Sequence, residues 1–100
     1  MRYGAYVYIV CSNNRNVLYT GVSTDLRKRI HEHKHKHYIM SFTSRYNCSV
    51  LVYYRFFQQI TLAIQEEKRI KGCSRQHKLD LINEMNPDWK DLWLEVQHWD

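Results

Sequence analysis

Tyr8 and Tyr19 are the first residues in this sequence whose types and spacing could bring reactive groups together, because their phenols would share one face of a sheet. Each lies in a segment rich in β-branched and aromatic residues, over 6–11 and 17–22, with a polar stretch between them. This pattern predicts a β-hairpin. A two-residue turn sets Tyr8 opposite Tyr19 and a four-residue loop makes them diagonal neighbours, but both leave the phenols on one face of the sheet. Aromatic pairs are also common as plain packing, so other residues must support a site.

Arg29 adds a cation that could bind phosphate, because it borders the apolar positions Leu26 and Ile30 of the next predicted helix. It shares a stripe of that helix with Asp25 and His33, four residues before and after it. A guanidinium held beside a core presents a fixed fork of donors that suits a phosphate group. An ion pair with Asp25 is the alternative explanation.

A carboxylate interrupts the apolar stripe of a later predicted helix. The stripe consists of Ile60, Ala63, Ile64 and Ile70. Glu67 fills its remaining position. Because burying an unpaired carboxylate is costly, we expect a cation, a metal ion or a hydrogen-bond donor to face it. The alternative is a rotated stripe that leaves Glu67 at a solvated edge, in an ion pair with Lys71 one turn further on.

The charge is unevenly distributed along the chain. Residues 1–75 hold thirteen Lys and Arg and four acidic residues, whereas residues 76–100 hold two Lys and six acidic residues. A basic body is typical of proteins that meet a polyphosphate, although a solvated cationic surface has the same composition. Seven basic residues are candidates for contacts with a nucleic-acid backbone: Arg27, Lys28, Lys34, Lys36, Arg45, Lys71 and Arg75.

Histidines alternate at four positions, His31, His33, His35 and His37. Residues two apart point to different sides of a helix, so the four could converge on a metal only in an extended segment. The sequence offers no cysteine ligands nearby and no second residues that would hold the histidine rings in place. It therefore favours a solvated helix end with general affinity for transition metals over a specific zinc site.

Length and composition exclude several classes of protein. One hundred residues with 44% hydrophobic and 14% aromatic content predict a single folded domain, over 1–100. No apolar run approaches the roughly 18 residues of a membrane span, and early arginines leave no room for a signal-peptide core, so we expect a cytoplasmic protein. Cys11, Cys48 and Cys73 are too few and too scattered for a disulfide framework or a zinc knuckle.

The spacing of the hydrophobic residues predicts the strands and helices that must position these side chains. Strands are predicted over 6–11, 17–22 and 50–54, and helices over about 25–34 and 61–71. A third helix and a short C-terminal helix follow. The chain therefore belongs to the α/β class, as an α+β fold in the order β-β-α-β-α-α with a short last helix.

Capping residues mark where these helices begin and end. The candidate N-caps are Ser23 or Thr24, Ser74 before the third helix, and Asn86, with Pro87 as the first residue of the last helix. Gly72 would end the second helix in a left-handed conformation. An apolar stripe in the acidic, Trp-rich tail predicts that residues 87–100 dock on a core of about 5–86.

Together these residues resemble the motifs of the GIY-YIG nuclease family. Tyr6-Val7-Tyr8 is similar to the first motif and Tyr19-Thr20-Gly21 to the second, with Arg29 and a helical glutamate beyond them. The resemblance covers residues 5 to about 93 and is nearest to a short stand-alone bacterial branch, through 19–22, 67–72 and 86–92. Tyr6 departs from the motif glycine and would crowd the site, and Cys73 replaces a usual aromatic residue.

The resemblance implies a small three-stranded antiparallel sheet flanked by helices, with one catalytic site on one sheet face. It matches the catalytic positions to Tyr8, Tyr19, Arg29, His33 and Glu67, the metal ligand to Glu67, and positions that shape the motif to Gly21 and Asn86. An N-cap role also suffices to explain Asn86.

The expected function is therefore a metal-dependent endonuclease that hydrolyses phosphodiester bonds in DNA processing or repair, with DNA expected ahead of RNA. One Mg²⁺ or Mn²⁺ would be held by Glu67, which suffices because Mg²⁺ keeps most of its waters. Arg29 would stabilise charge in the transition state. Tyr8 would be the base if cationic neighbours favour its phenolate, with Tyr19 orienting water or phosphate and His33 relaying the proton.

Two other functions are compatible with the sequence. A nucleic-acid-binding module on the same scaffold, with negligible turnover, would follow if Tyr6 obstructs the site. A protein-interaction domain would use the acidic, Trp-rich tail, and residues 87–100 could then be removed without loss of folding.

Overall fold

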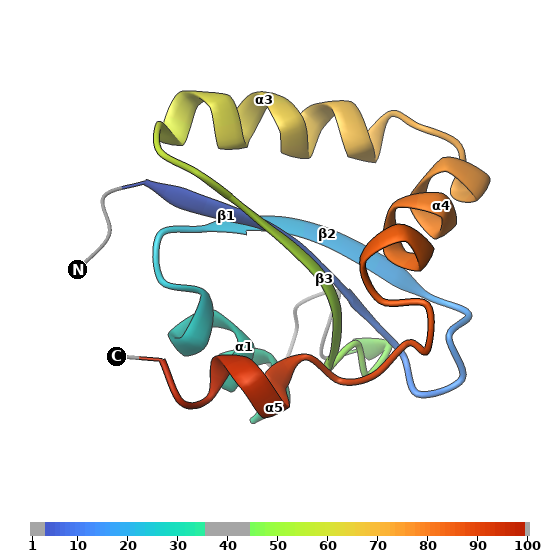
Figure 1. The fold of residues 1–100 in the computed structure, drawn as a ribbon. Helices are drawn as coiled ribbons and strands as arrows, with labels where there is room; N and C mark the ends of the chain where they lie inside the picture. Colours follow the sequence, from blue (N-terminus) through green and yellow to red (C-terminus); the bar gives the residue numbers. More distant parts are fainter. Residues whose placement is uncertain (1–3, 36–44, 100) are drawn as a thin grey trace.

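The chain folds into a three-stranded antiparallel sheet with helices on both faces, as seen in a computed structural model (Figure 1). The structure describes residues 4–35 and 45–99. Its elements are β1 (Ala5–Cys11), β2 (Leu18–Ser23), α1 (Leu26–Lys34), β3 (Val50–Phe57), α3 (Ile60–Lys71), α4 (Arg75–Met85) and α5 (Trp93–Val96). The predicted α+β class and antiparallel sheet are confirmed, and β3 is three residues longer than expected.

The central strand β1 is fully buried, because it lies between β2 and β3 and helices cover both of its faces. Its register with β2 sets Tyr8 opposite Gly21, with Tyr19 as a diagonal neighbour. Of the two predicted registers, the four-residue loop is thus correct. Ser12 closes the loop, since its N–H donates to the carbonyl of Val17 at 3.0 Å and its hydroxyl accepts from the Val17 N–H at 3.1 Å.

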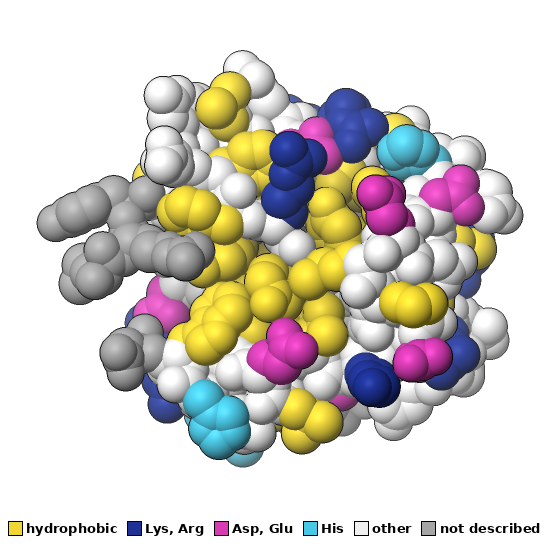
Figure 2. All heavy atoms as spheres, in the orientation of Figure 1, with side chains coloured by type: hydrophobic (Ala, Val, Ile, Leu, Met, Phe, Trp, Pro, Cys, Tyr) yellow, Lys and Arg dark blue, Asp and Glu magenta, His cyan; other side chains and the backbone are white. Residues whose placement is uncertain are grey.

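Alternation along β1 divides the core into two layers. The layer beneath α3 and α4 includes Val7, Ile9, Ala63, Ile70 and Ile82, and the layer against α1 and α5 includes Tyr6, Tyr8, Val10, Leu26, Ile30, Leu92 and Val96. Figure 2 shows, in the same view, hydrophobic side chains gathered between α3 and α5 across the face that carries β3. The two predicted phenols therefore belong to the layer of α1.

The first helix begins one residue later than predicted, and its cap is Asp25 rather than Ser23 or Thr24. The Asp25 carboxylate accepts a hydrogen bond from the Lys28 N–H at 3.1 Å. Ser23 forms a turn before the cap, with its hydroxyl accepting from the Asp25 N–H at 3.0 Å. A carboxylate at this position also suits the positive end of the helix dipole.

The second long helix ends at Gly72 as predicted, but Gly72 has a right-handed conformation, with φ −82°. The prediction of a left-handed cap is wrong. The predicted apolar stripe is also too wide, because Ile60 and Ile64 are 46% and 36% exposed. Ser74 caps α4 as predicted, accepting a hydrogen bond from a backbone N–H of the first turn.

Asn86 ends α4 instead of opening the next helix. Its side-chain amide donates to the carbonyls of Val52 at 3.2 Å and Lys90 at 2.8 Å, and its side-chain oxygen accepts from the Lys90 N–H at 3.0 Å. These bonds hold an irregular loop, so the short helix α5 begins only at residue 93. The tail packs on the sheet, with Leu92 and Val96 buried. Removing residues 87–100 would therefore uncover the core, which argues against a free partner-binding tail.

Within the described ranges, no helix is long and apolar enough to cross a membrane. The predicted loop over 38–47 lies mostly outside the described residues, as do Lys36 and His37.

Candidate active site

Tyr8 lies at the centre of the site. Its ring packs over Gly21 of β2, the residue opposite it in the sheet, which has no side chain in the way. A Cβ atom on Gly21 would meet the Tyr8 Oη at 2.5 Å and the Cζ at 2.6 Å. The glycine is thus required by the close approach of the ring and not by an unusual backbone angle. Tyr8 is only 1% exposed, so its ring has little room to move.

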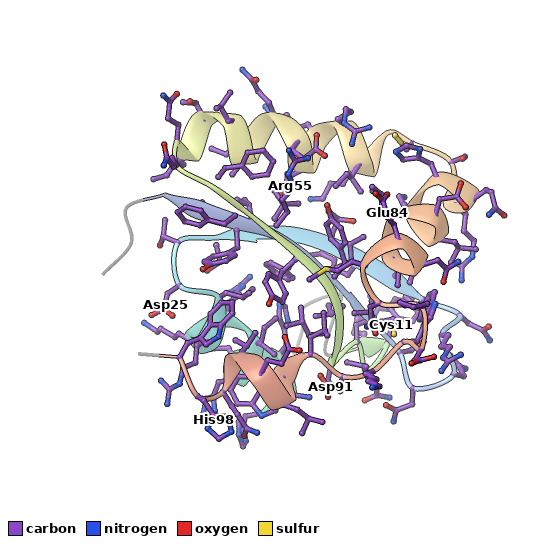
Figure 3. The ribbon with its side chains drawn as sticks, in the orientation of Figure 1. Cys11, Asp25, Arg55, Glu84, Asp91 and His98 are labelled. Carbon is purple, nitrogen blue, oxygen red and sulfur yellow. The ribbon has the colours of Figure 1, made fainter. Side chains whose placement is uncertain are left out.

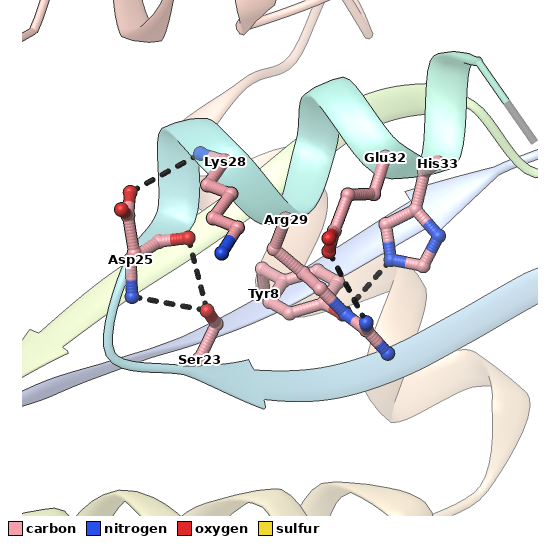
Figure 4. Close-up of polar contacts among 7 residues, drawn as sticks. All are labelled: Tyr8, Ser23, Asp25, Lys28, Arg29, Glu32 and His33. Carbon is pink, nitrogen blue, oxygen red and sulfur yellow. Dashed lines mark hydrogen bonds and ion pairs between the residues drawn. The ribbon is translucent and has the colours of Figure 1, made fainter. Parts of the chain in front are cut away.

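The phenol oxygen of Tyr8 is held by two residues of α1 (Figure 4). His33 places its Nε2 at 2.9 Å from this oxygen, and Arg29 donates to it from Nε at 3.4 Å. Since a guanidinium can only donate, the phenolic proton is available for the imidazole to accept. His33 is itself buried, as predicted from the period of the helix.

Burial controls the protonation of Tyr8 and His33. Burial raises the pKa of Tyr8 to about 12, although the hydrogen bond and charge of Arg29 oppose this. Burial, followed by the charge of Arg29, lowers the pKa of His33 to about 4. Arg29 thus favours the phenolate, as expected of a cationic neighbour, but burial outweighs its effect. The phenol therefore stays protonated and the imidazole neutral near pH 7, and His33 orients the phenol in the resting protein.

Arg29 is half-buried and pairs with a carboxylate other than the one expected. Its Nη1 lies 3.4 Å from Oε1 of Glu32, one turn further along α1, while the carboxylate of Asp25 caps the helix instead. Glu32 is the ion-pair partner of Arg29 because it faces the site, whereas Asp25 lies at the end of the helix and caps it. Sequence reasoning missed Glu32, although its i,i+3 spacing from Arg29 could have revealed it.

Glu67 joins the site from α3 around the edge strand β2. Its carboxylate lies 3.7 Å from Nζ of Lys71, and that ammonium lies 5.6 Å from the ring centroid of Tyr19. Tyr19 in turn packs edge-on against His33, with ring centroids 6.0 Å apart. The negative charge of Glu67 also contributes to the raised pKa of Tyr8, although it is the smallest of the causes that act on this phenol. The predicted alternative, an ion pair with Lys71, is thus present, yet the Glu67 side chain is only 16% exposed.

The donor set around Glu67 fits Mg²⁺ or Mn²⁺ better than a structural zinc ion. Within the described residues, no group of three or more His, Cys, Asp and Glu side chains could hold a metal. Mg²⁺ needs only one or two carboxylates, with waters and phosphate oxygens completing its shell. The ammonium of Lys71 shows that a cation is accommodated at this carboxylate.

Several predicted phosphate contacts prove to be internal ties. Lys34 binds Asp91 at 2.6 Å and the carbonyl of Ser49 at 2.9 Å. Asp91, which also accepts from the Leu51 N–H, lies beside the start of β3 (Figure 3). Lys34 therefore fastens the tail to α1 and β3, and nothing in the sequence marked Asp91 as its partner.

Two arginines of the predicted set also bind backbone carbonyls. Arg27 donates to Gln97 at 3.1 Å, and Arg75 donates to Arg15 at 2.9 Å. Lys28 and Arg45 are exposed. Arg27, Lys71 and Arg75 are exposed as well, and Lys36 lies outside the described residues, so contact of these cations with a nucleic-acid backbone stays a prediction.

The predicted crowding by Tyr6 is not seen. Its ring packs against Tyr54, Phe56 and Trp99, with centroids 5.1–6.0 Å apart, on the side of β1 that faces β3. Gly21 and β2 lie on the other side. The substitution of the motif glycine has therefore enlarged an aromatic cluster next to the site.

All three cysteines are free thiols, and Cys11 and Cys48 are buried, as expected of core residues. Cys73 is less buried, and its thiol donates to the carbonyl of Arg69 at 3.0 Å.

Comparison with known proteins agrees with this geometry. The family described as the GIY-YIG catalytic domain matches residues 4–80. A UPF0213 protein of Syntrophus aciditrophicus is 34% identical over 84 residues, which is 83% of this chain and 93% of the relative. UPF0213 proteins of Staphylococcus haemolyticus and Staphylococcus saprophyticus are 40% and 38% identical, each covering 79% of this chain and 94% of the relative. No solved structure gives a significant match.

Proposed function

This chain belongs to the GIY-YIG family, whose catalytic domain is a nuclease domain, and we propose from this premise that it is a metal-dependent DNA endonuclease. The observation that carries the proposal is the phenol oxygen of Tyr8, which is held between His33 and Arg29. Glu67 is linked to these residues through Lys71 and the ring of Tyr19. These groups supply the parts that phosphodiester hydrolysis needs: a proton acceptor, a fixed cation and a ligand for a metal ion.

Arg29 would bind the scissile phosphate. Its guanidinium is partly exposed and kept in place by Glu32 and the Tyr8 oxygen, so that it presents a fixed positive charge to an anion. Hydrogen bonding to Tyr8 raises the pKa of Arg29, which keeps the guanidinium charged throughout the working pH range.

Glu67 would hold one Mg²⁺ or Mn²⁺. When bound, such an ion supplies positive charge to a phosphate oxygen and acidifies nearby oxygen groups. Lys71 would give up its ion pair with Glu67 and turn its ammonium toward the substrate, at a distance its flexible side chain permits.

Tyr8 would act as the base once positive charge near Glu67 counters the effect of burial on its pKa. His33 would keep the phenol oxygen aimed into the site, since its neutral imidazole accepts a hydrogen bond from the phenol in the resting state. Tyr19 would orient water or phosphate from β2, beside His33.

The experiment is cleavage of a fluorescently labelled branched DNA with and without Mg²⁺. Glu67→Gln is expected to abolish Mg²⁺-dependent cleavage while circular dichroism and DNA binding stay unchanged. Glu66→Gln is the matched control, because Glu66 is the adjacent carboxylate of α3 and pairs with Arg69 at 2.6 Å instead of facing Tyr8. Wild-type rates in both Tyr8→Phe and Arg29→Ala would contradict the assignment.

A binding module with negligible turnover is the second candidate, favoured by the raised pKa of Tyr8 and by the Lys71 ion pair at Glu67. It predicts salt-dependent binding of branched DNA or RNA without products at any Mg²⁺ concentration. The same labelled substrates, run as DNA and as RNA, decide between the two functions and between the two nucleic acids.

A further inference from the structure

The histidine run divides between two sides of α1. His33 points inward to Tyr8 and is 8% exposed, whereas His31 and His35 are exposed on the outer side. Their rings contact each other in a tilted arrangement at the last turn of the helix, with centroids 4.1 Å apart and planes at 45°. The turn itself is closed by the His35 N–H, which donates to the His31 carbonyl at 3.0 Å.

We propose that His31 and His35 form a two-imidazole site for a transition-metal ion such as Zn²⁺, Ni²⁺ or Cu²⁺. Two histidines four residues apart on a helix are the arrangement in which metal-binding helices present both imidazoles to one ion. With metal–nitrogen distances of about 2.1 Å, two imidazoles on one ion have centroids about 5 Å apart. Small side-chain rotations therefore convert the present spacing into a chelate, with water filling the other positions.

The charges around this place act in both directions. The site lies at the C-terminal turn of α1, where the helix dipole is negative and favours a cation. On the same turn, Lys34 is bound to Asp91 at 2.6 Å and Glu32 pairs with Arg29. Arg27 and Lys28, one turn before His31, oppose a cation, but both are exposed and therefore screened by solvent.

This site is chemically distinct from the one proposed at Glu67. Imidazole nitrogens select borderline transition metals, whereas Mg²⁺ requires oxygen ligands. The two-imidazole site also lies on the helix that carries Arg29 and His33, so an ion bound there would stabilise the last turn of α1. Its test needs no nuclease activity, and its failure would leave the proposed function untouched.

The test is titration of the metal-free protein with Ni²⁺, followed by calorimetry and by thermal unfolding. We expect one ion per chain, a melting temperature raised by about 10–20 °C at 100-fold excess over the dissociation constant, and at least tenfold weaker binding in His31→Ala and in His35→Ala. Cu²⁺ should also quench tryptophan fluorescence, because the ring of Trp93 lies 6.4 Å from that of His31. Excess Mg²⁺ should not compete.

His77→Ala is the matched control, since His77 lies on α4 and contacts Arg69 instead of α1. It should bind Ni²⁺ like the wild type, as should His37→Ala. Unchanged Ni²⁺ affinity in the His31→Ala/His35→Ala double variant would overturn the proposal, and so would loss of binding in His37→Ala alone.

Discussion

Replacing Gly21 by alanine should push the ring of Tyr8 out of place. The new Cβ would lie 2.5–2.6 Å from the Oη and Cζ of a side chain that is 1% exposed. Overpacking a core by one methyl group costs about 1–3 kcal/mol, and the better strand propensity of alanine returns about 0.5–1 kcal/mol. We therefore expect a net loss of about 1 kcal/mol in the free energy of unfolding, or roughly 5 °C in the melting temperature of a chain this small.

A double-mutant cycle isolates this contact. In Tyr8→Leu the atoms that the new methyl group would meet are absent, so Gly21→Ala should there stabilise by about 0.5–1 kcal/mol and the coupling should be about 2 kcal/mol. Gly72→Ala is the matched control, because its Cβ would meet only backbone oxygens at 3.6 and 3.7 Å. The measurement is urea unfolding of the four proteins. Equal costs of Gly21→Ala in both backgrounds would refute the packing of Tyr8 over the glycine.

Three further outcomes follow from the site. The pKa of His33 is lowered in the folded protein, so the folded state favours the neutral ring. The free energy of unfolding should therefore be highest above about pH 6.5 and fall by about 2–3 kcal/mol toward pH 4. Urea unfolding at pH 7.5 and pH 4.5 should show a smaller decrease in His33→Gln than in the wild type. Lys71→Met should lower the Mg²⁺ concentration that gives half-maximal cleavage several-fold, because the ion pair with Glu67 is lost; an unchanged Mg²⁺ dependence would mean that Lys71 does not compete there. Lys34→Met should lower the free energy of unfolding by about 1 kcal/mol, because Asp91 loses its ion-pair partner, as measured by urea unfolding. DNA affinity, measured by fluorescence anisotropy, should stay nearly unchanged. Weaker DNA binding in a stably folded variant would mean that Lys34 contacts the substrate.

Local patterns in the sequence were sufficient for the elements and for most of the site. The alternation of Tyr8 and the period of Leu26, Ile30 and His33 determine which face each side chain takes, because strand and helix geometry leave few options. These faces depend only on residues near one another in the chain. The resemblance to the GIY-YIG motifs, and not the periodicity, assigned Arg29 and His33 to one site with the phenols.

The errors arose where side chains meet residues far away in sequence. Lys34 looked available for phosphate because Asp91, its partner, lies 57 residues away. Asn86 read as a helix cap because its bond to Val52 is invisible without the sheet. The pKa of Tyr8 was misjudged because nearby cations can be counted in a sequence and burial cannot.

The outer edge of β3 meets the C-terminal tail at Leu51, whose N–H donates to Asp91 at 3.2 Å and whose carbonyl accepts from the Leu92 N–H at 2.8 Å. An uncovered edge strand is a template on which other chains can add strands and aggregate. The tail thus acts as a shield over the start of β3. Shortening the chain before Asp91 should make this small protein prone to self-association even under conditions in which its sheet survives.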